Sequence, residues 1–179
     1  SLKESRVDPG MNTKFTFSKM TEPDAREVLA WRYDEPYDFY DRDPHFSDRD
    51  VATLIEPTNL YLSVRDGDGE LIAYYCFGSE AQIEGGDYIE TALDTMGQAR
   101  PNILGSGFGE MFIRVAMDFG TMFFHPRRFR ATVPAFNTRA IKMCEKAGFT
   151  SVTTFTRSDG VNFVVLTKVA EREDLESKE

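Results

Sequence analysis

A length of 179 residues is typical of one domain, and such a chain can bury a core that needs no metal or disulfide to stabilise it. Hydrophobic residues make up 41% and charged residues 28%, which excludes a collagen, a wholly disordered chain and a disulfide scaffold. The net charge of −9 disfavours a nucleic-acid partner, because the chain repels phosphate backbones. No apolar run reaches the roughly 18 residues of a membrane-spanning helix, so we expect no membrane partner either.

Cysteine and histidine are scarce. Cys76 and Cys144 both lie in apolar segments, which suits a reducing cytosol. Neither these cysteines nor His45 and His125 show the spacing of a metal site. We therefore expect a cytoplasmic protein whose function needs no metal.

Apolar periodicity and turn residues predict the elements in chain order. The clearest hairpin surrounds the Asp-Gly-Asp-Gly turn at 66–69, and the clearest amphipathic helix covers 105–119. Thr21 and Asn137 are typical caps of two further helices. The expected strands are 15–18, 60–65, 71–77, 88–99, 129–133, 153–157 and 161–167. This order indicates one mixed α/β domain without the regular alternation of a doubly wound sheet.

The two ends differ in composition from the domain between them. We expect 1–10 to be a flexible N-terminal arm or a remnant of an expression vector, because it is polar and does not begin with methionine. The charged residues of 170–179 indicate a frayed C-terminal tail. The domain itself then covers 11–169.

A glycine-rich loop, Leu104-Gly105-Ser106-Gly107-Phe108-Gly109, precedes the amphipathic helix. Glycine lets a backbone approach a ligand closely, and the first N–H groups of a helix are unpaired and partly positive, so the loop predicts a pyrophosphate site. The alternative is a tight strand-to-helix turn, for which one or two glycines suffice. The dinucleotide fingerprint is excluded because Glu110 stands where its third glycine belongs, and a Walker loop because no lysine follows.

Two motifs in this part of the chain are recognisable. Leu104-x-x-Gly107-x-Gly109 follows the pattern Gln/Arg-x-x-Gly-x-Gly/Ala except at its first residue. The segment 137–149 follows Asn-x-x-Ala-x-x-x-Tyr-Glu-Lys-x-Gly-Phe except that Cys144 replaces the tyrosine. In both motifs the chain resembles the GNAT superfamily of acetyl-CoA-dependent N-acetyltransferases, in particular its branch of ribosomal-protein and aminoglycoside acetyltransferases. The aromatic stretch 31–40 is similar to that of a group of bacterial members.

The resemblance implies a single α/β (α+β) domain of the GNAT type, with a mixed, mostly antiparallel sheet of about seven strands and about four helices. It also implies acetyl-CoA as cosubstrate, its pyrophosphate in the glycine loop and its pantetheine arm on the backbone of the preceding strand. Gly97 suits such close approach, although a β-bulge is an alternative reason for a glycine there. The implied cofactor-binding residues are Gly97, Gln98, Ala99, Leu104, Gly105, Ser106, Gly107, Phe108, Gly109 and Asn137.

Acetyl transfer to an amine also needs proton transfers. An amine of pKa near 10 is only about a thousandth neutral at pH 7, so a carboxylate that takes its proton helps. Asp94 stands where many family members carry a glutamate, and Glu90 shares its face if the strand alternates regularly. Either could instead be a solvated strand residue. Cys144, at the position of the family's tyrosine acid, is a candidate proton donor to the leaving thiolate or a packing residue.

The acceptor is expected to meet the segment around 31–45, where acidic and aromatic residues alternate. Carboxylates beside aromatic faces suit an organic cation, but solvated charges over an aromatic cluster are the alternative. The sequence leaves a small amine, an aminoglycoside and a protein N-terminus open. The substrate-binding candidates are Trp31, Tyr33, Asp34, Tyr37 and Tyr40.

The function implied is an N-acetyltransferase that moves an acetyl group to a primary amine by direct attack in a ternary complex. The alternative is an acyl-CoA-binding module of the same fold without turnover. The expected partners are a small-molecule or peptide amine and, as a further candidate, a second copy of the chain in a homodimer.

Overall fold

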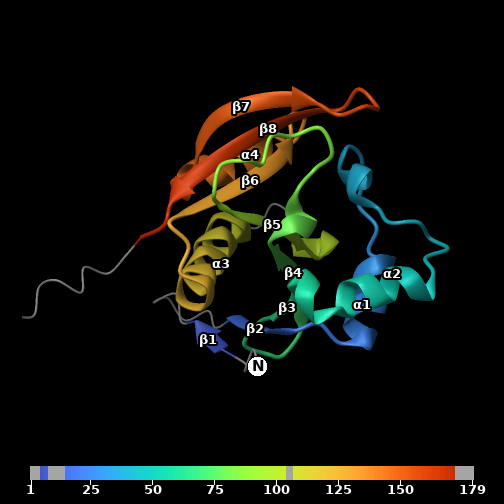
Figure 1. Ribbon diagram of the computed structural model, residues 1–179. Helices are drawn as coiled ribbons and strands as arrows, with labels where there is room; N and C mark the ends of the chain where they lie inside the picture. The colour runs from blue at the N-terminus through green and yellow to red at the C-terminus, as the bar shows by residue number, and fades with distance from the viewer. Residues whose placement is uncertain (1–4, 8–14, 104–106, 172–179) are drawn as a thin grey trace, which may run out of the picture.

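The computed structural model describes residues 5–7, 15–103 and 107–171, which form one eight-stranded sheet with helices on both faces (Figure 1). The strand order is β1-β2-β3-β4-β5-β6-β8-β7, and every neighbouring pair is antiparallel except β5 and β6. The strands are β1 (Ser5–Val7), β2 (Phe15–Lys19), β3 (Tyr61–Arg65), β4 (Leu71–Phe77), β5 (Leu93–Ala99), β6 (Arg128–Pro134), β7 (Thr150–Thr156) and β8 (Asn162–Val169). This is the mixed, mostly antiparallel fold class expected, with β1 added to the seven predicted strands.

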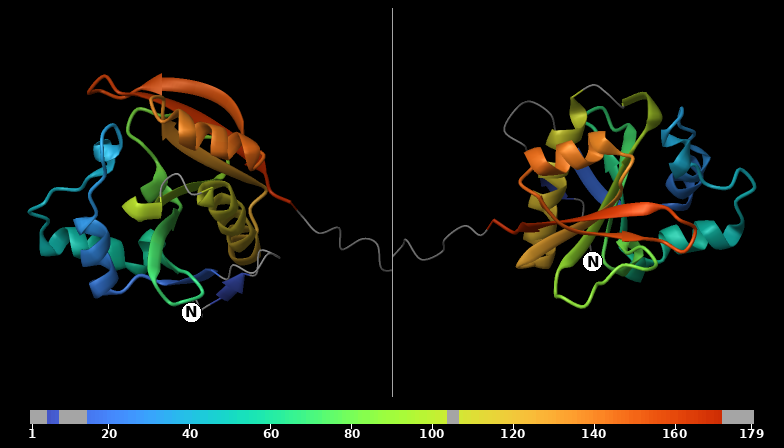
Figure 2. Two further views of the ribbon diagram at one scale, coloured as in Figure 1. Left: turned by 180° about the vertical axis from the view of Figure 1, so that it is seen from behind. Right: turned by 90° about the horizontal axis from the view of Figure 1, so that it is seen from above.

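The helices divide between the two faces (Figure 2). The four α-helices are α1 (Glu22–Ala30), α2 (Asp48–Ile55), α3 (Phe108–Phe124) and α4 (Thr138–Lys146). Buried residues of α3 and α4 belong to one core cluster, and those of α1 and α2 to a second cluster on the opposite face. Among the described residues, no helix is long and apolar enough to cross a membrane.

Most predicted elements are present, with three differences. The predicted strand 88–99 begins only at Leu93, because Tyr88 turns out of the sheet and its hydroxyl contacts Thr132 Oγ1 at 3.0 Å. The long helix continues to Phe124, past Gly120, whose missing side chain leaves room for the rings of Phe77 and Phe129. The helix α2 was not predicted, although its N-cap and third residue form a capping box.

The strands β5 and β6 separate after a short parallel ladder. Only 93–95 of β5 pair with 129–131 of β6. Beyond that point β5 remains paired with β4 as far as Ala99, whereas β6 follows β8 as far as Pro134. The sheet therefore opens as a wedge, and α3 begins beside it (Figure 1).

Candidate active site

A cavity of about 480 Å³ lies in the wedge between β5 and β6. It is bounded by the first turn of α3, one face of α4 and the segment that contains the 3-10 helix Tyr37–Tyr40. Its lining residues used below are Tyr33, Tyr37, Phe39, Tyr40, Gly97, Gln98, Ala99, Gly107, Phe108, Gly109, Glu110, Asn137, Arg139, Met143, Cys144, Lys146, Arg157 and Phe163. Segments far apart in the sequence thus share one enclosed space.

The N-terminus of α3 forms one end of this cavity. Gly107 caps the helix in a left-handed conformation, with φ of +77°, and as a glycine it offers no side chain to bond the first turn. The exposed N–H groups of such a turn bind anions. A Cβ at Gly109 would overlap the side chain of Met143, so this glycine brings α3 close to α4. Gly107, Phe108 and Gly109 line the cavity as expected, while Leu104, Gly105 and Ser106 lie outside the described residues.

The free edge of β5 forms a second wall. In its antiparallel ladder with β4, the N–H and C=O groups of alternate residues face away from β4, and here these are Gly97 and Ala99. The Ala99 carbonyl accepts a hydrogen bond from Tyr33 Oη at 2.7 Å. The register is regular at Gly97, so the bulge alternative is not found. A Cβ at Gly97 would instead overlap the ring of Tyr75.

The two carboxylates considered as general bases lie outside the cavity lining. Asp94 is 4% exposed, and its two oxygens accept hydrogen bonds from Arg130 Nε at 2.6 Å and Nη2 at 2.9 Å. Gln82 Nε2 donates to the same carboxylate at 2.8 Å. Glu90 is exposed in the loop before β5, where its backbone carbonyl accepts from Arg130 Nη1. Its predicted place on the strand was wrong, because β5 starts three residues later.

Cys144 faces the cavity from α4 but is 7% exposed and belongs to the core cluster around α3. Burial raises the pKa of its thiol to about 12. A cysteine buried in an apolar cluster is typical of a packing residue. These features favour the packing alternative over a general acid.

Asn137 and Tyr40 form a contact that the sequence could not indicate. The Asn137 Oδ1 accepts from the N–H of Ala140 at 3.0 Å, as the cap of α4. This fixes the amide so that Nδ2 donates to Tyr40 Oη at 2.8 Å. The phenol oxygen accepts this bond, and Tyr40 lines the cavity. Burial raises the pKa of Tyr40, which keeps the phenol protonated.

The acidic and aromatic residues of the acceptor segment separate in space. Tyr33, Tyr37 and Tyr40 line the cavity, whereas Trp31 is buried beneath α1 and α2 in the second core cluster. Asp34 is exposed and is not part of the lining. The aromatic half of the expected site therefore faces the cavity, and the expected carboxylate does not.

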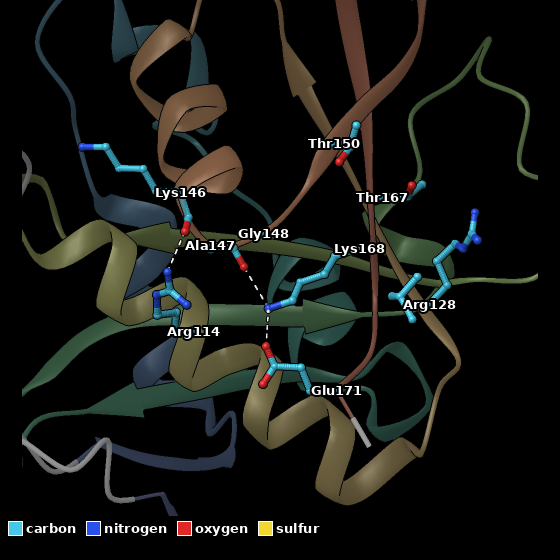
Figure 3. Close-up of a pocket in the computed structure, with 10 residues that line it drawn as sticks. Arg114, Arg128, Lys146, Ala147, Gly148, Thr150, Thr167, Lys168 and Glu171 are labelled. Atoms are coloured by element: carbon cyan, nitrogen blue, oxygen red, sulfur yellow. Dashed lines mark hydrogen bonds and ion pairs between the residues drawn. The ribbon is translucent and has the colours of Figure 1, made fainter. Parts of the chain in front are cut away.

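A second cavity, of about 450 Å³, lies outside the sheet where α3, α4 and β8 meet (Figure 3). Two of its four basic side chains, Arg114 and Lys168, bind the protein itself. Lys168 Nζ donates to the Ala147 carbonyl at 2.8 Å and pairs with Glu171 at 3.7 Å, and Arg114 Nη2 donates to the Lys146 carbonyl at 2.6 Å. We interpret this cavity as a place where polar contacts hold α3, α4 and β8 together. Over the described ranges, no three His, Cys, Asp or Glu side chains gather as a metal site.

Comparison with known proteins identifies the fold of the chain. No family model and no curated protein matches the chain. Solved structures match it closely in backbone: spermidine N-acetyltransferase from Vibrio cholerae, in complex with CoA and spermine, is 17% identical with a TM-score of 0.67 over 87% of this chain and 95% of that one. The chain has the GNAT acetyltransferase fold.

Two further GNAT structures agree with this result. The aminoglycoside acetyltransferase AAC(6')-Ib, in complex with coenzyme A, is 21% identical with a TM-score of 0.68 over 87% of this chain and 94% of that one. A GNAT-family acetyltransferase from Bacillus anthracis is 15% identical with a TM-score of 0.67 over 95% of this chain and 98% of that one. The resemblance read from the glycine loop and the late helix is thereby confirmed at the level of the fold.

Proposed function

We propose that this protein is an acetyl-CoA-dependent N-acetyltransferase that transfers the acetyl group directly to a primary amine. The observation that carries the proposal is the wedge between β5 and β6. It joins, in one cavity, a helix N-terminus that begins at a glycine, a strand edge that has left its neighbour and an aromatic segment. Such an enzyme must hold a phosphate-bearing thioester and an amine together. The helix N-terminus suits the phosphates, the strand edge suits the arm that carries the thioester, and the aromatic segment suits the amine. The GNAT structures that share the fold include enzymes crystallised with CoA.

The residues at the two ends of the cavity fit acetyl-CoA. The first turn of α3, from Gly107 to Gly109, would bind its pyrophosphate through backbone N–H groups. The free backbone groups of Gly97 would bond the pantetheine arm as an added strand would, and Gln98 and Ala99 lie beside it. Asn137 already uses its side chain for the cap and for Tyr40, so its role is to position that phenol.

In the chemical step, the small neutral fraction of the amine, whose ammonium proton has gone to bulk water, attacks the thioester carbonyl carbon, and the C–S bond then breaks. We assign Tyr40 as the proton donor to the leaving CoA thiolate, because it lines the cavity and its oxygen accepts the bond from Asn137, which leaves the hydroxyl proton for donation. The phenolate so formed regains a proton, through water, from the nitrogen that has become the amide. The products are the acetylated amine and CoA thiol, with Tyr40 restored.

Asp94 then has a different role from the base first considered. Its ion pair with Arg130 ties β5 to β6 at Asp94↔Arg130, within the last three paired positions before the strands part. We propose that it is a positioning residue that maintains the wedge.

The cosubstrate assignment is tested by thermal unfolding. At 100 times its Kd, a ligand that binds only the native state adds about 2.7 kcal/mol of stability. Acetyl-CoA should therefore raise the melting temperature clearly, whereas NAD and ATP should not. Gly107→Val, which places a branched side chain at a positive φ beside the phosphates, should abolish the shift while circular dichroism confirms folding. Equal shifts with all three nucleotides would contradict the assignment.

A further inference from the structure

The charge of the cavity differs from what the acidic sequence of the acceptor segment suggests. The cationic residues among its described lining are Arg139, Lys146 and Arg157, and the carboxylate is Glu110. Glu110 lies at the α3 end and pairs with Arg114 at 3.1 Å. The acceptor end is therefore aromatic and positively charged.

Arg139 has a buried hydrogen-bond donor that lacks a partner among the described residues. Its guanidinium carbon lies over the ring of Tyr37, 4.8 Å from the ring centroid, which is a cation–π contact. Its Nη1 is buried and has no hydrogen-bond partner in the described parts of the chain. A buried donor without a partner is unfavourable, and a ligand carboxylate would satisfy it.

Arg157, by contrast, already has partners. Its Nη2 pairs with Asp159 at 2.7 Å, and its guanidinium lies over the rings of Phe39 and Phe163. We therefore expect Arg157 to shape the aromatic wall, and Arg139 to recognise an anion.

The direction of α4 separates this anion from the phosphates of the cosubstrate. Asn137, at the start of α4, bonds to Tyr40 of the acceptor segment. Met143, more than one turn later, contacts Gly109 at the phosphate end. Arg139 lies near the start of α4 and stacks on Tyr37 of the acceptor segment, so its partner belongs to the acceptor.

We propose that the acceptor is an amine that carries its own carboxylate and an apolar or aromatic group, and that Arg139 selects it. This rests on the proposed transferase function. The carboxylate pairs with Arg139, the apolar group lies against the rings of Tyr37, Phe39 and Tyr40, and the amine reaches the thioester. A polycation, such as spermine in the Vibrio cholerae structure, meets positive charge here, and no carboxylate is among the described residues that line the acceptor end.

The test compares matched amines on the same enzyme preparation. Phenylalanine and its amide, and methionine and its amide, differ only in the carboxylate, and spermidine and kanamycin represent polycations. The readout is kcat/KM from CoA thiol release with acetyl-CoA. We expect each carboxylate to exceed its amide by tenfold or more, and both polycations to be poorer still. Because the comparison is a ratio, it does not depend on the folded fraction of a variant.

Variants in α4 test whether Arg139 causes this preference for carboxylates. Arg139→Gln should bring the carboxylate-to-amide ratio near one, and Arg139→Lys should lower it partly, because lysine keeps the charge but not the planar fork. Lys142→Gln, which removes a charge from an exposed position of the same helix outside the lining, should leave the ratio unchanged. Amides or polycations that react better than carboxylates, or a ratio that Arg139→Gln does not alter, would overturn the proposal.

Failure of the transferase function is recognised separately. If no amine releases thiol, the same pairs are tested for thermal stabilisation of the CoA-bound protein. Carboxylates that stabilise it more than their amides would still support recognition by Arg139 while the transferase proposal fails. Equal or no stabilisation would overturn both.

Discussion

Replacing Asp94 by alanine should destabilise the fold strongly. Asp94 and Arg130 are 4% and 5% exposed, and two short hydrogen bonds join them. The variant leaves the guanidinium buried, and its partners among the described residues are then the Glu90 carbonyl and the face of Tyr88. Breaking a buried pair on one side costs about 3–5 kcal/mol, because the remaining charge is uncompensated.

For a domain of this size that cost corresponds to a fall of about 6–20 °C in melting temperature, at roughly 2–4 °C per kcal/mol. Calorimetry measures it, and Asp94→Leu combined with Arg130→Met is the matched control. That double variant removes both charges, so it should recover most of the loss.

Asp94→Asn separates the positioning role from that of a base. The amide retains much of the shape and some of the hydrogen bonds but cannot take a proton from the amine. We expect it to lower stability and to leave the pH profile of turnover per folded molecule unchanged. A stable Asp94→Asn protein that has lost turnover and the acidic limb of its profile would refute this reasoning.

Three further predictions concern single residues. Tyr40→Phe should lower turnover about 10²-fold or more, because this is the typical contribution of a general acid, and should leave the affinity for acetyl-CoA almost unchanged. A loss of turnover smaller than threefold would contradict the assignment of Tyr40 as the acid. Cys144→Ala should keep more than about a tenth of turnover per folded molecule, well above that general-acid loss, and a hundredfold loss in a folded protein would restore the thiol as the acid. Although burial raises the pKa of Asp24, hydrogen bonds from Arg65 and Ser63 bring it below the ordinary value. The stability that this ionised carboxylate contributes is therefore present above about pH 4 and lost in more acidic solution. Measured by urea unfolding, the difference in free energy of unfolding between wild type and Asp24→Asn should shrink from pH 7 to about pH 3.

The elements that local patterns define were predictable from the sequence. The hairpin around 66–69, the cap at Thr21 and the apolar stripe of α3 depend on residues a few positions apart. Their boundaries depend on tertiary contacts, as where Tyr88 leaves the sheet for Thr132. The local sequence determines where those elements form, and tertiary contacts determine where they begin and end.

The site was less predictable, because its contacts join distant residues. Asp94 was a sound carboxylate candidate by position, but its partner Arg130 is 36 residues away. The bond between Asn137 and Tyr40 spans 97 residues. No periodicity in the irregular segment 31–45 indicates that Tyr33, Tyr37 and Tyr40 line the cavity while Asp34 is exposed. The unpaired donor of Arg139 likewise exists only in the folded chain.

The central claim, that the protein transfers an acetyl group from acetyl-CoA to an amine, is tested most directly by thiol release. The release is followed with a mixture of amines, and mass spectrometry identifies the acetylated product. We expect release that depends on both an amine and Gly107, with one acetyl amide formed for each thiol. Acetyl-CoA that stabilises the protein but yields no amine-dependent thiol would contradict the claim and indicate an acyl-CoA-binding module instead.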